Sequence, residues 1–88
     1  MVQETICEVC HEIAAFLVRK NGDYGNSFAD PVGIFSKLSP LDQLNVRIDD
    51  KLKRIKNAGE KNFNEDTELD LVGYLILKRV LLRLSPSK

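Results

Sequence analysis

The segment from Leu69 to Leu84 constrains the fold of this chain more than any other, because its apolar residues fall on every side of a helix. A helix that is apolar all round must be buried all round. Two other helices of an 88-residue chain cannot cover it, since chains of this length bury only about 60–65% of the surface exposed when unfolded. Other copies of the chain can supply the cover, so we predict a closed homo-oligomer, a dimer or a tetramer.

The rest of the chain also has helical patterns, and no alternation of polar and apolar residues predicts a strand. We predict an all-α fold for one domain, residues 1–88, with three main helices, a glycine-containing loop and a short helix. The first helix is expected from Gln3 to Lys20, ending at Asn21-Gly22, which both tolerate left-handed backbone. Its apolar stripe consists of Ile6, Val9, Cys10, Ile13, Phe16 and Leu17. The loop then covers residues 21–31, and the short helix runs from Val32 to Leu38.

The middle helix has a clear start signal. Ser39 can cap it, Pro40 suits its first position, and Asp42 lies at the capping-box position. Its end is expected at residues 57–59, and the last helix is expected from about Asn64 to Ser85-Pro86. The apolar stripe of the middle helix consists of Leu41, Leu44, Ile48, Leu52 and Ile55.

Charge and cysteine content narrow the classes of partner. The 13 Lys and Arg residues balance 13 Asp and Glu residues, so we expect no nucleic-acid polymer as a partner. The last apolar segment is too short and too charged to cross a membrane, since it carries Asp70, Lys78, Arg79 and Arg83. The first residues lack the pattern of a signal peptide, which is a charged region followed by an apolar run. Two cysteines are too few for a disulfide framework. We therefore expect a cytoplasmic protein.

Cys7, Cys10 and His11 match the pattern of c-type haem attachment. We favour a structural role, because haem attachment takes place in an exported setting and the only methionine, Met1, leaves no axial partner. A zinc site would lack a fourth ligand. Cys10 is expected to act as a small hydrophobic residue, and His11 to lie at the surface.

Carboxylates recur at helical spacing in two places. Glu4, Glu8 and Glu12 step by four along the first helix, which predicts a solvated face or, for the last two, part of an acidic metal site. Asp70 lies within an almost wholly apolar stretch. A buried carboxylate needs a partner, so we expect Asp70 to meet an Arg, a Lys, a metal or a ligand hydroxyl.

A cationic face is predicted on the middle helix from three basic residues: Arg47, Lys51 and Arg54. It is either a salt-bridged surface or a phosphate clamp, since Arg offers a planar fork and Lys a point charge. On the last helix, four residues spaced by four form a second line: Asp66, Asp70, Tyr74 and Lys78. No phosphate-binding glycine loop and no set of residues for acyl transfer is present.

Three blocks of this sequence stand out, KNGDYGNSF at residues 20–28, IDDKLKRI at 48–55 and EDTELDLVGY at 65–74. Together they resemble the nucleotide-modification-associated domain family of phages, which is similar to the MazG-like all-α nucleoside triphosphate pyrophosphatases. Residues 20–28, KNGDYGNSF, resemble the family's K-N-x-D-Y-G-x-S-F signature. Residues 48–55, IDDKLKRI, resemble its D-K-L-x-R-I helix, and residues 65–74, EDTELDLVGY, resemble its D-x-x-x-D-L-x-x-Y helix. The blocks occur in the family's order.

The resemblance implies a helical oligomer with a nucleotide pocket. The loop residues would line the base or sugar, Lys51 and Arg54 would meet phosphates, and Asp66 and Asp70 would bind magnesium or ribose hydroxyls. The predicted ligand-binding residues combine those of the loop, of the cationic face and of the line on the last helix. They are Lys20, Asn21, Asp23, Tyr24, Ser27, Phe28, Arg47, Lys51, Arg54, Asp70 and Tyr74.

Binding without cleavage is the leading interpretation. MazG-like enzymes carry E-E-x-x-E on one helix, whereas the first helix here offers only Glu8 and Glu12. A small phage oligomer that binds nucleotides without cleaving them resembles the viral sponge proteins that sequester the cyclic nucleotide signals of bacterial defence systems such as CBASS, Pycsar and Thoeris. We thus expect no cofactor, and a place in the host bacterial cytoplasm.

Two alternatives remain open. The first is a magnesium-dependent pyrophosphatase with a metal set of Glu8, Glu12, Asp66 and Asp70, since such enzymes use carboxylates to gather the ions that activate water. The second is an interaction module whose partner is a protein, with residues 21–30 buried against that partner and no affinity for nucleotides.

Overall fold

The computed structural model describes residues 1–25, 29, 37–59 and 65–84. They form three α-helices, α1 (Val2–Tyr24), α2 (Pro40–Ala58) and α3 (Glu65–Leu84), and no strand occurs among the described residues. The prediction of an all-α fold is confirmed. Within this described part, no helix is long and apolar enough to cross a membrane.

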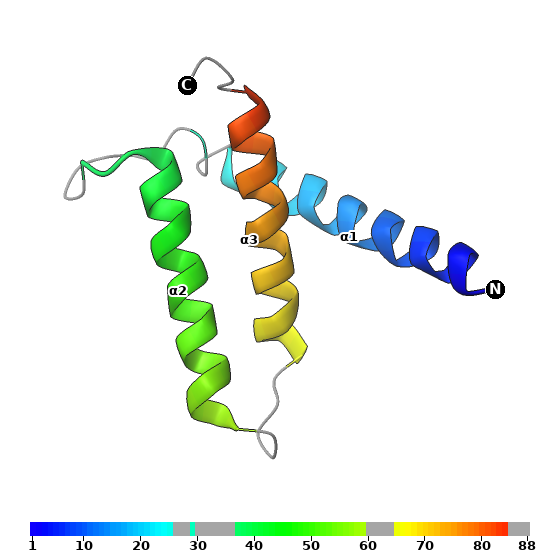
Figure 1. The fold of residues 1–88 in the computed structure, drawn as a ribbon. Coiled ribbons are helices and arrows are strands. Elements are labelled where there is room, and N and C mark those ends of the chain that lie inside the picture. Colours follow the sequence, from blue (N-terminus) through cyan, green and yellow to red (C-terminus); the bar gives the residue numbers. More distant parts are fainter. Residues whose placement is uncertain (26–28, 30–36, 60–64, 85–88) are drawn as a thin grey trace.

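Helices α2 and α3 run antiparallel, side by side, and make the most extensive contact between elements (Figure 1). The buried apolar residues at this contact are Leu44 and Ile48 of α2 and Leu81 of α3. The predicted stripe of α2 is buried only in its first half, because Leu52 and Ile55 are exposed. The core of one chain is therefore small.

The first turn of α2 forms as its sequence predicts. The Ser39 side chain accepts a hydrogen bond from the backbone N–H of Asp42 at 3.1 Å, and Pro40 occupies the first helical position. Proline has no N–H to leave unsatisfied there, so both residues favour the same boundary. At the other end, Gly59 adopts a positive φ of 70° and ends the helix.

The predicted end of the first helix is wrong. Helix α1 continues through Asn21, Gly22 and Asp23 to Tyr24, and it ends at Gly25, whose φ of 59° and ψ of 40° are left-handed. The Gly25 N–H then meets the carbonyl groups of Asn21 and Gly22. Asn, Gly and Asp each cost a helix about 1 kcal/mol or less, so a second glycine can move the stop by one turn.

The predicted short helix, Val32 to Leu38, lies mostly outside the described residues. Of its residues, Lys37 and Leu38 are described and are not helical. Asn64 and Ser85-Pro86, the predicted ends of the last helix, also lie outside the described residues, next to the observed ends of α3.

The second half of α1 packs on α3 at Gly73. A Cβ atom at this buried glycine would lie 3.0 Å from Cδ2 of Leu17. The missing side chain thus allows α1 to approach α3 closely.

Substitutions at Gly73 should separate this contact from helix propensity. We expect Gly73→Leu to lower the free energy of unfolding by about 1–3 kcal/mol through overpacking against Leu17. Gly73→Ala should stay within about 1 kcal/mol of the parent, because its gain in helix propensity offsets a small shift of Leu17. Urea unfolding followed by circular dichroism measures both, and a leucine variant as stable as the parent would show that α1 does not pack there.

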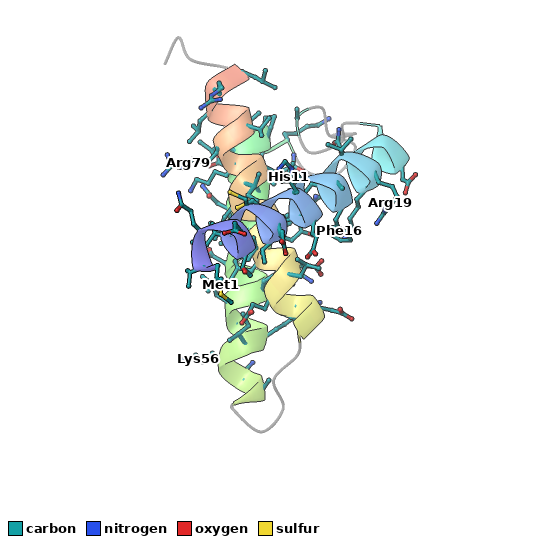
Figure 2. All side chains as sticks on the ribbon, turned by 90° about the vertical axis from the view of Figure 1, so that its right-hand side faces the viewer. Met1, His11, Phe16, Arg19, Lys56 and Arg79 are labelled. Carbon is teal, nitrogen blue, oxygen red and sulfur yellow. The ribbon has the colours of Figure 1, made fainter. Side chains whose placement is uncertain are left out.

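The first half of α1 projects away from the α2–α3 pair (Figure 1), and Figure 2 shows its Met1 end turned toward the viewer. The radius of gyration is 14.7 Å, against about 12 Å for a compact domain of this length. Ile6 and Val9 are exposed, and Cys10, predicted to pack as a small hydrophobic residue, is exposed as well. No second helix among the described residues covers this part of the stripe. His11 lies at the surface, as predicted.

Candidate functional site

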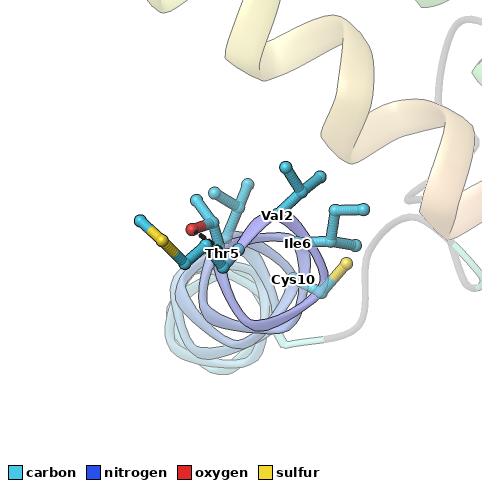
Figure 3. Close-up of a pocket in the computed structure, with 6 residues that line it drawn as sticks. Val2, Thr5, Ile6 and Cys10 are labelled. Carbon is cyan, nitrogen blue, oxygen red and sulfur yellow. Dashed lines mark hydrogen bonds between the residues drawn. The ribbon is translucent and has the colours of Figure 1, made fainter.

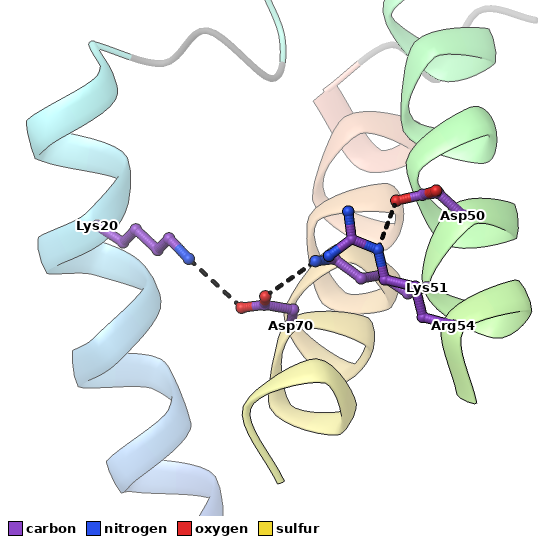
Figure 4. Close-up of polar contacts among 5 residues, drawn as sticks. All are labelled: Lys20, Asp50, Lys51, Arg54 and Asp70. Atoms are coloured by element: carbon purple, nitrogen blue, oxygen red, sulfur yellow. Dashed lines mark hydrogen bonds and ion pairs between the residues drawn. The ribbon is translucent and has the colours of Figure 1, made fainter. Parts of the chain in front are cut away.

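Asp70 connects the three helices through two ion pairs (Figure 4). Its Oδ1 lies 3.4 Å from Nζ of Lys20 on α1, and its Oδ2 lies 3.2 Å from Nζ of Lys51 on α2. One carboxylate thus accepts from two ammonium groups that are far apart in the sequence. Of the partners predicted for Asp70, an Arg, a Lys, a metal or a ligand hydroxyl, the structure shows two lysines, and Asp70 is only partly buried. We call Lys20, Lys51 and Asp70 the Lys–Asp–Lys cluster.

The position of each residue follows from its helix. Lys51 comes three residues after the buried Ile48, so it lies at the edge of the face that α2 turns to α3. Asp70 lies three residues before Gly73, where α1 approaches. Lys20 lies four residues after Phe16, and its Nζ is 5.2 Å from the centre of the Phe16 ring. This cation–π contact holds the lysine against α1.

The cluster is partly shielded from water. The side chain of Lys51 is 14% exposed, that of Asp70 is 26% exposed, and that of Lys20 is 40% exposed. The charges therefore interact more strongly than surface charges do, although less strongly than in a dry interior. Two ammonium groups against one carboxylate leave a formal surplus of one positive charge. Such a group can receive an anion on the lysines and a hydroxyl on the carboxylate.

The other two members of the predicted cationic face lie outside the cluster. Arg47 is exposed, and Nε of Arg54 pairs with Oδ2 of Asp50 at 3.3 Å, with both side chains more than half exposed. Pairs of this kind, one helical turn apart at the surface, contribute about 0.3–0.5 kcal/mol. The Arg54 guanidinium is thus held weakly and can exchange Asp50 for another anion.

The remaining predicted ligand residues are spread over α1, α3 and the segment after α1. Asn21 and Asp23 lie on the last turns of α1, and Tyr74 is half-buried on α3. Ser27, Phe28 and the side chain of Tyr24 lie outside the described part of the structure. Their predicted contacts with a base or sugar stay predictions.

The carboxylates of the enzyme alternative do not gather within one chain. Glu8, Glu12 and Asp66 are exposed, whereas Asp70 belongs to the Lys–Asp–Lys cluster. Across the described residues, no group of three or more His, Cys, Asp or Glu side chains is arranged to hold a metal ion.

Phe16 has a role that its place in the predicted apolar stripe does not indicate. Its ring also contacts the Lys20 ammonium group. The signal was present as an aromatic residue four positions before a lysine, which are neighbouring positions on one helix face. Both residues lie within the predicted first helix, Gln3 to Lys20, so helical spacing alone could have indicated this contact.

The two ion pairs of Asp70 should differ in strength. In double-mutant cycles with Asp70→Asn, we expect a coupling energy of about 1–2 kcal/mol for Lys51→Met and below about 0.5 kcal/mol for Lys20→Met, because Lys20 is more solvated. Urea unfolding of the single and double variants at fixed protein concentration gives both values. Equal coupling energies would contradict the difference in burial.

Comparisons with protein-family models, curated proteins and solved structures give no match. The resemblance to the nucleotide-modification-associated domain family thus stays a prediction from three motif blocks. Each block contributes one residue to the Lys–Asp–Lys cluster: Lys20 comes from the first, Lys51 from the second and Asp70 from the third. The fold therefore brings one residue of each block to one place.

Proposed function

We propose that this protein binds and sequesters a nucleotide without cleaving it. The observation that carries the proposal is the Lys–Asp–Lys cluster, in which one carboxylate holds two ammonium groups from two other helices. A nucleotide offers the complementary groups, because phosphate oxygens accept from ammonium groups and ribose hydroxyls donate to a carboxylate.

Binding would occur by exchange of partners at this cluster. A phosphate would take up the surplus positive charge of Lys20 and Lys51, while Asp70 keeps them close together. Arg54 can join, because its exposed pair with Asp50 costs little to break. Tyr24 or Phe28 would stack on the base, a contact that contributes roughly 1–3 kcal/mol per base in single-strand binding proteins.

We propose the class of nucleotide from the resemblance in design to the viral sponge proteins and from symmetry. The ligand we propose is a cyclic nucleotide or dinucleotide signal of bacterial immunity, bound in the host cytoplasm by a phage protein that evades antiviral defence. We further propose that the protein works as a homo-oligomer, whose two-fold axis would match a two-fold symmetric cyclic dinucleotide.

A capture assay tests the proposal. Deoxynucleoside triphosphates, cyclic mononucleotides and cyclic dinucleotides are incubated with excess protein and magnesium, filtered before and after heat denaturation, and separated by ion exchange. The expected result is one nucleotide that disappears from the filtrate and returns intact after heating. Recovery as a monophosphate would make the protein a pyrophosphatase, and no depletion of any nucleotide would favour the protein-interaction module.

A further inference from the structure

The apolar stripe of α1 continues beyond the part that its own chain covers. Val2, Ile6, Val9 and Ile13 follow one another at spacings of four, three and four residues. Ile6 is 58% exposed and Val9 is 45% exposed. Figure 3 shows Val2, Ile6 and Cys10 on the same side of the helix, where they line a shallow apolar depression. We call residues 2–13 the α1 arm.

Helix α3 carries a second uncovered surface on its outer side. Val72, Leu75, Arg79 and Leu82 follow at spacings of three, four and three residues, and Leu75 and Leu82 are each nearly half exposed. With Ile76 and Lys78, these residues line one shallow groove. We call it the α3 groove.

The two surfaces match in periodicity. Both follow the alternating spacing of three and four residues that lets the side chains of one helix fit between those of another. The seam of the α1 arm is apolar, and that of the α3 groove is apolar except for Arg79. Among the described residues, neither seam is covered by another helix. Two seams of this kind can pack along each other over about three turns.

The two surfaces also match in charge. Glu8 and Glu12 lie on the α1 arm, and Lys78 and Arg79 line the α3 groove. Among the described residues, none of these four side chains takes part in an ion pair. An acidic arm laid in a basic groove would pair charges that one chain leaves solvated, and complementary charge favours this partner over others.

The α1 arm cannot fill the groove of its own chain. Helix α1 is continuous from Val2 to Tyr24, and its second half is fixed on α3 at Gly73 and Asp70. From there the arm projects away from α3 (Figure 1). Only the arm of another chain can reach the groove.

The exposed area is sufficient for such an interface. The chain exposes 7285 Å², about 2,000 Å² more than expected for a folded monomer of its mass. A stable interface of standard size removes about 800 Å² from each partner. We propose that the α1 arm of one chain packs into the α3 groove of a second copy, and that the second arm packs reciprocally into the first groove.

Charge reversal tests the reciprocal contact. We expect sedimentation to give a dimer or a higher even assembly for the parent, with association weakened at least about tenfold in Glu8→Arg/Glu12→Arg and in Lys78→Glu/Arg79→Glu. Mixing the two variants should restore assembly, because each arm then meets a groove of opposite charge. The matched control, Lys53→Glu/Lys56→Glu on the exposed face of α2, should associate like the parent.

Two results would overturn the proposal. One is a parent protein that sediments as a monomer at micromolar concentration, and the other is a mixture of the two variants that does not assemble although each is folded by circular dichroism. Assembly is measured without nucleotide. A negative assembly result would therefore contradict the proposed interface and not nucleotide capture, and a negative capture result would contradict the proposed function and not the interface.

Native Cys10 provides a test that does not depend on charge. In a Cys7→Ser background, Leu75→Cys or Leu82→Cys should form a disulfide-linked dimer with Cys10 of the second chain under mild oxidation. Cys7→Ser alone should remain monomeric on a non-reducing gel. A disulfide-linked dimer of Cys7→Ser alone would show that the arms of two chains contact each other, which would overturn the proposed contact. The double variants would overturn it too if their cysteines were oxidised while each chain stayed monomeric on the gel.

Discussion

Leu44→Ala is expected to lower the free energy of unfolding by about 3 kcal/mol, a large part of the stability of a domain of this size. Leu44 is only 1% exposed, and it is the most deeply buried residue of a core that also contains Ile48 and Leu81. Truncation removes three carbon atoms and leaves a cavity between α2 and α3. Because few of the described residues are buried, this part of the chain has little other apolar contact to compensate.

Val46→Ala is the matched control. Val46 lies on the same helix two residues away and is 57% exposed, so its truncation should change the free energy of unfolding by less than about 0.5 kcal/mol. Urea unfolding at one fixed protein concentration measures both variants, since the stability of an oligomer depends on concentration. Equal effects at the two positions would mean that the α2–α3 contact is not the centre of the core.

Lys51→Met should weaken nucleotide capture at least about tenfold if the proposed function is right, because charge-assisted hydrogen bonds contribute about 1.5–3 kcal/mol. Lys51 is the most buried charge of the Lys–Asp–Lys cluster, so water screens it least. Methionine keeps much of the packing of the lysine stem and removes only the ammonium group. Asp70 retains Lys20 as a partner, so the chain should stay folded.

Lys53→Met serves as the control for this prediction. Lys53 lies on the same helix two residues away, is exposed, and makes no ion pair with any other described residue. The affinity of both variants for the captured nucleotide is measured by the depletion assay, with circular dichroism as the check on folding. An equal loss in both would indicate general electrostatic attraction, and no loss in Lys51→Met would remove the Lys–Asp–Lys cluster from the proposed site.

Local chemistry was enough to predict several features. The cap at Ser39 and the proline at position 40 define the start of α2 through hydrogen bonds and a backbone angle within one turn. The isolation of Asp70 in an apolar stretch predicted a partner for its carboxylate, an Arg, a Lys, a metal or a ligand hydroxyl, because the cost of burying a carboxylate does not depend on the fold. The identity of that partner does depend on the fold.

Neighbours within one or two turns are enough to predict that the chain is helical, where α2 begins and which residues form apolar stripes. The tertiary structure determines which part of each stripe is covered: Leu44 is buried and Leu52 is exposed on one helix, because near Leu52 the side chain that α2 directs to Asp70 of α3 is that of Lys51. It also decided that Lys51 rather than Arg54 meets Asp70, although both belong to one cationic face. Such choices depend on contacts between distant segments, and helical periodicity specifies a face but not what packs against it.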